Sequence, residues 1–329
     1  MSGNTKIQRK KLTGSAIVKD IFQIREIVIL LIVVTLFIVL ALNSKQFLSF
    51  PNFRVLGNYM AMDMIIGAFL TISLIAGNTD FSVGSMMGVT AFVTGICLNK
   101  GFSIPVCIAL GILTGAFLGF INGIIIVRFK VLPMIATMGT WMAYKGIGLM
   151  LINSSSLSNF PKEFKAIAQD WKIFGVSSII IIMLVVTVIA AFLLKYVSFF
   201  HQSYFIGSNI ESARLSGIKV NKFVYLSYIL IGIFSAVAGI LSISRYGSAP
   251  ASLGQGVEFR VISALLIGGV SLLGGEGSIL GTFLGILLMA LISNGLTLFG
   301  IDASLQSVLV GAIMIGSVAI DEANRRRQN

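Results

Sequence analysis

The sequence has few charged residues. Asp, Glu, Lys and Arg make up 11% of the 329 residues, whereas hydrophobic residues make up 56%. A soluble globular domain has about 25% charged residues. So little charge cannot cover the surface of a water-soluble fold of this length, and the apolar residues occur in runs long enough to span a bilayer. The composition therefore predicts an all-α integral membrane protein.

Cysteine is also scarce, and the motifs of common enzyme classes are missing. The two cysteines, Cys97 and Cys107, stand at apolar positions, which excludes a disulfide framework or a zinc site and favours ordinary packing. The sequence has no Gly-Lys dipeptide, and so no P-loop for a nucleotide. It also has no cluster of metal-ligating residues and no nucleophile motif. We therefore expect no catalytic residues and no cofactor, and the energy for any active transport must come from elsewhere.

The formal net charge of +12 does not indicate a nucleic-acid-binding protein. The basic residues lie in short segments between apolar runs, where they orient a membrane protein and attract anionic lipid headgroups. Most Lys and Arg residues fall on one side of the membrane if both termini are cytoplasmic, which is the orientation we expect. The predicted regions are a basic N-terminal tail over 1–26, a transmembrane domain over 27–320 and a basic C-terminal tail over 321–329.

The apolar runs predict about ten transmembrane spans. The second, third, eighth and ninth are rich in Gly and Ser, a composition compatible with broken or partly re-entrant spans. The spans are Ile27–Leu42, Asn58–Ala76, Ser82–Asn99, Ile104–Val127, Leu132–Leu151, Val176–Tyr196, Phe223–Tyr246, Val261–Leu273, Ile279–Phe299 and Leu305–Ile320.

Short motifs recur in the same order in spans two to five and seven to ten. They are Ile66-Gly67-x-Phe69 with Ile231-Gly232-x-Phe234, Asp80-Phe81-Ser82 with Glu258-Phe259-Arg260, Gly115-Ala-Phe-Leu-Gly119 with Gly281-Thr-Phe-Leu-Gly285, and Asn122-Gly123 with Asn294-Gly295. An offset of five spans places the two copies in opposite orientations. Inverted repeats are typical of transporters. Glycines four residues apart favour close helix packing, with a solute path as the other interpretation.

Two features within or between the spans are candidates for a translocation path or gate. Asp80, Ser82 and Ser85 belong to the polar segment 77–85 and could cap the following helix or line a path. Lys145 lies inside the fifth span, where it could serve a path or extend to the membrane surface. Asp63, in the second span, has the same alternatives, and we favour extension to the surface.

The loop 201–222 predicts a short helix on the cytoplasmic side. Ser208-x-x-Glu211 fits a capping box, and Gly217 fits a helix stop about two turns later. Such a helix could lie on lipid headgroups or dock into a groove of a cytoplasmic protein partner. Its length and mixed polarity favour docking.

Four signatures resemble the permease subunits of bacterial ABC importers of the ribose, rhamnose and autoinducer-2 group, and the resemblance covers nearly the whole chain. They are segment 77–85; Asn122-Gly123 with Leu132-Pro133-x-Ile135-Ala136-Thr137-x-Gly139-Thr140; Gly207-x-Asn209-x-x-x-Ala213-Arg214-x-x-Gly217-Ile218; and Ile267-Gly268-Gly269-x-Ser271-Leu272-x-Gly274-Gly275-x-Gly277-Ser278.

This resemblance implies a type II importer-like permease domain in the bacterial cell membrane. Two permease subunits, identical or different, would pair above two cytoplasmic ABC ATPase subunits, and an extracytoplasmic solute-binding protein would deliver a monosaccharide-like solute. The coupling residues to the ATPase would be Gly207, Asn209, Glu211, Ala213, Arg214 and Gly217.

Two other functions are weighed against this one. An ion-coupled secondary transporter of a small polar solute would need several membrane-buried carboxylates, and the sequence offers few. A membrane enzyme or a scaffold subunit would fit the membrane spans, but the sequence contains no catalytic constellation that supports an enzyme.

Overall fold

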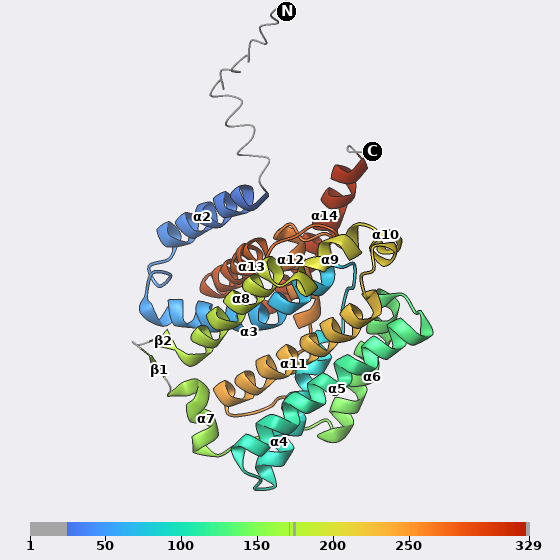
Figure 1. The fold of residues 1–329 in the computed structure, drawn as a ribbon. Coiled ribbons are helices and arrows are strands. Elements are labelled where there is room, and N and C mark those ends of the chain that lie inside the picture. The colour runs from blue at the N-terminus through green and yellow to red at the C-terminus, as the bar shows by residue number, and fades with distance from the viewer. Residues whose placement is uncertain (1–24, 171, 174–175, 327–329) are drawn as a thin grey trace, which may run out of the picture.

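The structure is a computed structural model that describes residues 25–170, 172–173 and 176–326 (Figure 1). The predicted N-terminal tail lies almost entirely outside these residues. The described chain forms helices α2 (Arg25–Asn43), α3 (Phe50–Ile75), α4 (Val83–Asn99), α5 (Ile104–Phe129), α6 (Pro133–Leu151), α7 (Lys162–Gln169), α8 (Ser178–Tyr196), α9 (Ser198–Ser208), α10 (Ile210–Leu215), α11 (Val220–Tyr246), α12 (Val257–Ile267), α13 (Ile279–Leu298) and α14 (Ala303–Arg326), and a hairpin of β1 (Lys172–Ile173) and β2 (Val176–Ser177).

Each predicted span corresponds to one helix. By length and composition, six helices can cross a membrane, namely α2, α3, α5, α8, α11 and α13. The expectation of a helical protein with several membrane-crossing segments is therefore confirmed. The helix α4 and part of α14 are shorter apolar helices.

The eighth predicted span is not a full crossing. Its helix, α12, has 11 residues and is about 16 Å long at 1.5 Å per residue, roughly half the thickness of the hydrocarbon core. It ends because Gly268 is followed by Gly269, whose φ of 86° leaves the helical region. By contrast, α3 and α13 are continuous, so the second and ninth predicted spans are unbroken.

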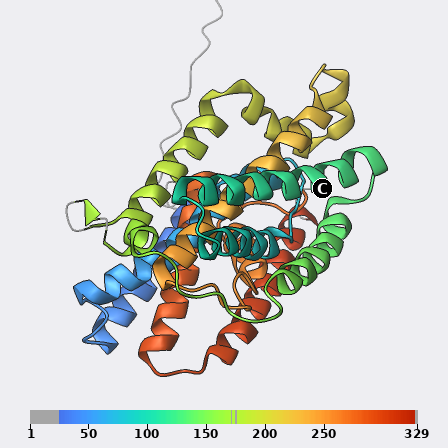
Figure 2. The same ribbon diagram turned by 90° about the horizontal axis from the view of Figure 1, so that it is seen from below.

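Helices α3 and α11 form the centre of the bundle. Helix α11 packs on α5, α4 and α3, while α3 also contacts α8, α13 and α12. The two central helices meet at Phe69 and Phe234, whose rings stack with centroids 3.9 Å apart. Figure 2 shows α4 near the middle of the molecule with longer helices around it. The core thus consists of helices from both halves of the chain.

The glycine rows let helix backbones approach closely. A Cβ atom at Gly119 of α5 would lie 2.1 Å from the carbonyl oxygen of Tyr228 in α11. A Cβ at Gly285 of α13 would lie 2.0 Å from the carbonyl oxygen of Ala264 in α12. These distances agree with the interpretation of the rows as packing faces rather than as the lining of a path.

This packing predicts that the same change, Gly→Ala, has different effects on stability at two positions. Gly119→Ala should destabilise the protein by about 1–3 kcal/mol, because α5 and α11 must move apart. Gly139→Ala in α6 should be neutral or stabilise by up to about 1 kcal/mol, since alanine favours the helix and its Cβ meets no described atom within 4 Å outside that helix. Thermal unfolding in detergent measures both, and equal melting temperatures for the two variants would contradict the packing argument.

Candidate functional site

The polar turn between α3 and α4 is buried and closed on itself. Asp80 is 0% exposed, and its Oδ1 accepts hydrogen bonds from the Ser82 backbone N–H at 2.7 Å and the Ser82 hydroxyl at 2.6 Å. Ser82 is the N-cap residue of α4, but its side chain makes no capping bond to the helix, while the Ser85 hydroxyl donates to the Ser82 carbonyl. The structure therefore places Asp80, Ser82 and Ser85 at the start of α4, where Asp80 binds Ser82 but no side chain caps the first turn of the helix.

Asn122 connects this turn to two more helices. Its amide donates to Ser82 Oγ at 2.8 Å and to Asp80 Oδ2 at 3.5 Å. Its carbonyl oxygen accepts a hydrogen bond from the hydroxyl of Tyr144 in α6 at 3.1 Å. Asp80, Ser82, Asn122 and Tyr144, called the Asp80 network below, thus join α4, α5 and α6. Because polar groups buried in a membrane protein need partners, this network fixes the relative positions of the three helices.

Lys145 follows Tyr144 in sequence but lies on the exposed side of α6. Its Nζ atom is 5.8 Å from the centre of the Trp141 ring. A small cavity of about 20 Å³ beside the contact of α4 and α6 is lined by Ser85, Trp141, Lys145 and Gln255 among others. The structure therefore brings Ser85 and Lys145 together, whereas Asp80 and Ser82 lie outside this cavity.

The predicted short helix is α10, and its cap differs from the expected one. Ser208 is the last residue of α9, and its hydroxyl donates to the Tyr204 carbonyl. The cap is Asn209, whose extended backbone lets its side chain accept a hydrogen bond from Ser212 N–H at 2.9 Å. The predicted capping box is therefore wrong by one residue.

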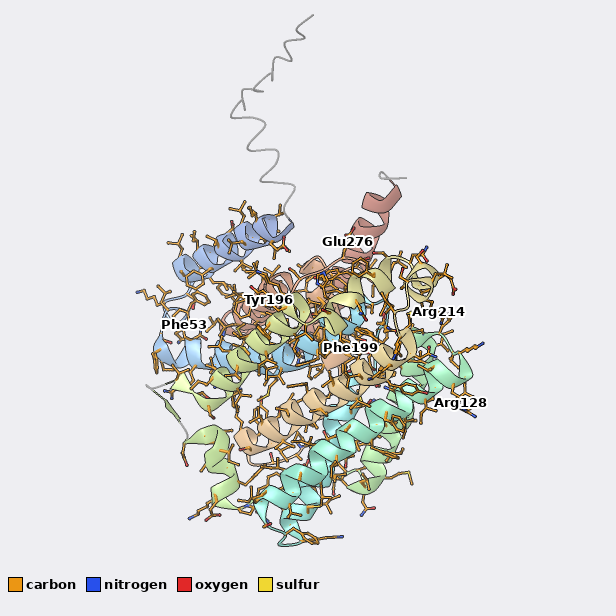
Figure 3. All side chains as sticks on the ribbon, in the orientation of Figure 1. Phe53, Arg128, Tyr196, Phe199, Arg214 and Glu276 are labelled. Carbon is orange, nitrogen blue, oxygen red and sulfur yellow. The ribbon has the colours of Figure 1, made fainter. Side chains whose placement is uncertain are left out.

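The remaining residues of α10 divide into an exposed and a buried set. Glu211 and Arg214 form an exposed ion pair at 3.0 Å, whereas Ala213 is buried. Gly217 ends the helix as expected, with φ of 81° and a hydrogen bond from Ile218 N–H to the Ala213 carbonyl. Arg214 lies at the same edge of the molecule as Arg128 at the end of α5, opposite Phe53 at the start of α3 (Figure 3).

Gly207 connects α10 to the polar turn. A Cβ atom at this position would lie 1.9 Å from the Ile75 carbonyl oxygen, so only glycine allows this contact. The same carbonyl accepts a hydrogen bond from Gly275 N–H at 2.7 Å. The glycine-rich segment 268–278 therefore packs between the end of α3 and the α9–α10 junction. Burial, with a smaller contribution from Glu26, raises the pKa of Tyr204, whose hydroxyl donates to the Gly277 carbonyl.

Sequence reasoning missed an ion pair in the bundle. Asp63 does not extend to the membrane surface as favoured, because its side chain is 4% exposed and its carboxylate binds Arg260 of α12. The two bonds, from Arg260 Nε and Nη2, are 2.6 and 2.8 Å long. The sequence shows an acid, Asp63, in the second predicted span and a base, Arg260, directly before the eighth. Nothing in the sequence indicates that these two residues contact each other.

Comparisons with known proteins agree with this geometry. Residues 56–318 match the family model described as the permease component of the branched-chain amino acid transport system, so the chain belongs to this family of permeases. The chain is similar to autoinducer 2 import system permease proteins LsrC. It is 32% identical to that of Escherichia coli strain SMS-3-5, with 92% of this chain and 91% of the relative covered. It is 30% identical to that of Photorhabdus luminescens, with 90% of this chain and 89% of the relative covered. A solved metal-chelate type ABC transporter in an inward-facing conformation has the same fold, with a TM-score of 0.50, 17% identity, and 90% of this chain and 99% of that chain covered.

The Asp80 network predicts a strong effect of Asn122→Leu. The substitution removes the hydrogen bonds that Asn122 makes with Ser82, Asp80 and Tyr144. Ser82 keeps its bond to Asp80 and Tyr144 its bond to the Leu118 carbonyl, whereas Asp80 Oδ2 loses its donor, so the total cost should be about 1–3 kcal/mol. Thr114→Val on the same helix is the control, because Thr114 is exposed and its hydroxyl binds only the carbonyl of Leu110 in its own helix. Thermal unfolding in detergent compares the two variants, and the network is not structural if both melt at the temperature of the unsubstituted protein.

Proposed function

We propose that this chain is the transmembrane permease subunit of an ABC importer for a monosaccharide-like solute of the ribose, rhamnose or autoinducer-2 type. The observation that carries the proposal is the 32% identity to an autoinducer 2 import permease over 92% of the chain. The nucleotide site would lie on separate cytoplasmic ATPase subunits, and an extracytoplasmic binding protein would deliver the solute. The location is the bacterial cell membrane, with both termini cytoplasmic.

The architecture we propose has about ten membrane segments, of which the eighth crosses only part of the bilayer, in an inverted repeat of spans two to five and seven to ten, as in type II importers. Two observations support it. Each predicted span has one helix, and the repeated Ile-Gly-x-Phe motifs meet where Phe69 stacks on Phe234. Symmetric contact between equivalent residues is expected where two copies of a repeat face each other.

We also propose that a second permease subunit, identical or related, covers one face of α6. This helix buries Thr140 and Tyr144, among a few others, and leaves Met142 and Lys145 exposed. A cation on a lipid-facing surface is costly, whereas a water-lined path between two subunits accommodates it. Lys145 with Ser85 would then border the path, and Asp80 with Ser82 would hold its wall in place.

Helix α10 is the proposed coupling helix for the ATPase. Its Glu211 and Arg214 are exposed, as docking requires, and Leu215 is 90% exposed. Gly207, Asn209 and Gly217 shape its two ends. The contact of Gly207 with Ile75 would transmit movement of the docked helix to the turn that carries Asp80.

The ion-coupled alternative has less support from the described carboxylates. Asp63 is bound to Arg260, and Asp80 is bound to Ser82 and Asn122. A coupling ion or proton needs a carboxylate that can exchange partners during the cycle. Of the described carboxylates near the bundle interior, Glu258 is the one that would have to serve.

Uptake measurements separate the two functions. We expect membrane vesicles that contain this chain, its ATPase and its binding protein to accumulate radiolabelled ribose, rhamnose or autoinducer-2 only when ATP is supplied to the cytoplasmic side. Glu258→Gln should leave the dependence on ATP unchanged. Uptake driven by a proton gradient without ATP, and abolished by Glu258→Gln, would establish the ion-coupled alternative instead.

Docking of α10 predicts a loss of ATPase binding on Leu215→Asp. The side chain contacts little of its own chain, so the fold should survive while a charge replaces the most exposed apolar residue of the helix. Tyr246→Asp is the control, since Tyr246 is 60% exposed at the far end of α11. Copurification of the ATPase should fall for the first variant alone.

Two harsher variants test the shape of α10. Gly217→Pro cannot adopt the φ of 81°, and Ala213→Glu places a charge at a buried position. Both should abolish ATPase binding while the chain still inserts into the membrane, as measured by membrane fractionation. Unchanged copurification of the ATPase would refute the assignment of α10.

A further inference from the structure

A cavity of about 380 Å³ lies between α3, α12 and α14. Cavities that hold small ligands have volumes of about 300–1,000 Å³ and combine apolar walls with a few placed polar groups. The polar and aromatic residues of this wall are Tyr59, Gln255, Phe259, Arg260, Gln306 and Ser307. None of them belongs to the path and coupling residues assigned above.

The guanidinium of Arg260 is held rigidly in this wall. Asp63 accepts hydrogen bonds from Nε and Nη2, and the guanidinium carbon lies 5.0 Å from the centre of the Tyr59 ring. Three of its five N–H groups remain outside the bonds to Asp63. A side chain fixed in this way offers hydrogen-bond donors at little entropic cost.

The ion pair also determines which charge the cavity prefers. Among the residues that line the cavity, Arg260 alone carries a full charge at neutral pH. The carboxylate of Asp63, which binds Arg260, compensates this charge. An unpaired guanidinium would favour a carboxylate or phosphate ligand. A guanidinium whose charge is compensated by a carboxylate still donates hydrogen bonds but attracts an anion far less. The wall therefore suits the hydroxyl and carbonyl oxygens of a neutral ligand.

The rest of the cavity wall provides amide, hydroxyl and apolar groups. The Gln306 amide donates to the Tyr59 hydroxyl at 3.2 Å and also to Ser293, which fixes its orientation. The Phe259 ring and the side chains of Val310 and Met314 supply apolar surface. A fixed amide, a hydroxyl and an aromatic ring together match a small molecule with both hydroxyl groups and C–H faces.

From these observations, we propose that this cavity binds a neutral polyhydroxylated solute of monosaccharide size. The inference rests on the proposed function and adds to it a site within one chain. Gln255 lines both this cavity and the small cavity beside Lys145. A solute held here would therefore lie next to the contact of α4 and α6.

A thiol-protection experiment tests binding without requiring transport. Ser307→Cys is made in a Cys97→Ala, Cys107→Ala background, and the purified full-length chain is labelled with a small maleimide with and without D-ribose or L-rhamnose. Labelling should slow by about tenfold when the sugar is present at roughly ten times its Kd. Val308→Cys is the control, because Val308 is 64% exposed and does not line the cavity.

The outcomes of this experiment are decisive. Protection of Ser307→Cys but not of Val308→Cys by a neutral sugar supports the site. Protection only by the anions D-gluconate or ribose 5-phosphate overturns the proposed charge preference, and no protection by any of these compounds overturns the site. Equal protection of both cysteines also overturns it, because the sugar would then act away from the cavity.

A steric variant provides a second measurement in case the cysteine variants do not fold. Gly311 lines the cavity, whereas Gly316 lies in a separate apolar groove beside α2. At either glycine, a Cβ atom would meet no described atom within 4 Å outside α14. In vesicles, Gly311→Phe should abolish ATP-dependent sugar uptake and Gly316→Phe should not. Full uptake by Gly311→Phe overturns the site alone, whereas lack of ATP-dependent uptake by the unsubstituted protein overturns the proposed function.

Discussion

The constraint on which the rest of this structure depends is that a bilayer offers no partner to a buried polar group. Polar side chains inside the bundle are therefore stabilised where the chain itself supplies their hydrogen bonds. The Asp80 network and the pair of Asp63 with Arg260 are two solutions to this problem. The first joins the consecutive helices α4, α5 and α6, and the second joins α3 to α12, which is distant in sequence, so polar groups contribute to the helix arrangement alongside the apolar packing.

Close backbone contacts explain why the cytoplasmic end proposed for ATPase docking is rich in glycine. At the α9–α10 junction, the backbones of Gly207, Ile75 and Gly275 approach one another directly, with one hydrogen bond from Gly275 N–H to the Ile75 carbonyl. A backbone contact has no side-chain rotamers that could absorb a displacement. Movement of α10 would therefore reach the end of α3, and the turn with Asp80 follows five residues later.

Much of the fold follows from the sequence because hydrophobic runs specify helices locally, and all ten predicted spans have a helix. The errors lie where tertiary contacts decide. The cap of α10 moved from Ser208 to Asn209 because the backbone becomes extended at Asn209, and Asp63 is paired because α12 brings Arg260 to it. Sequence spacing contains no information on a contact between residues 197 positions apart, so the ion pair and the cavity beside it could not be predicted.

The polar groups of the bundle differ in how completely they are satisfied, and this difference separates structural from functional candidates. Asp80 accepts two hydrogen bonds from Ser82 and one from Asn122, so little of its bonding capacity remains for a solute. Arg260 gives two N–H groups to Asp63 and keeps three in a cavity wall. A solute that leaves water for the bundle needs replacements for its own hydrogen bonds. Residues with spare, fixed donors can supply them, and this favours the wall at Arg260 over the turn at Asp80 as the place where the solute is bound.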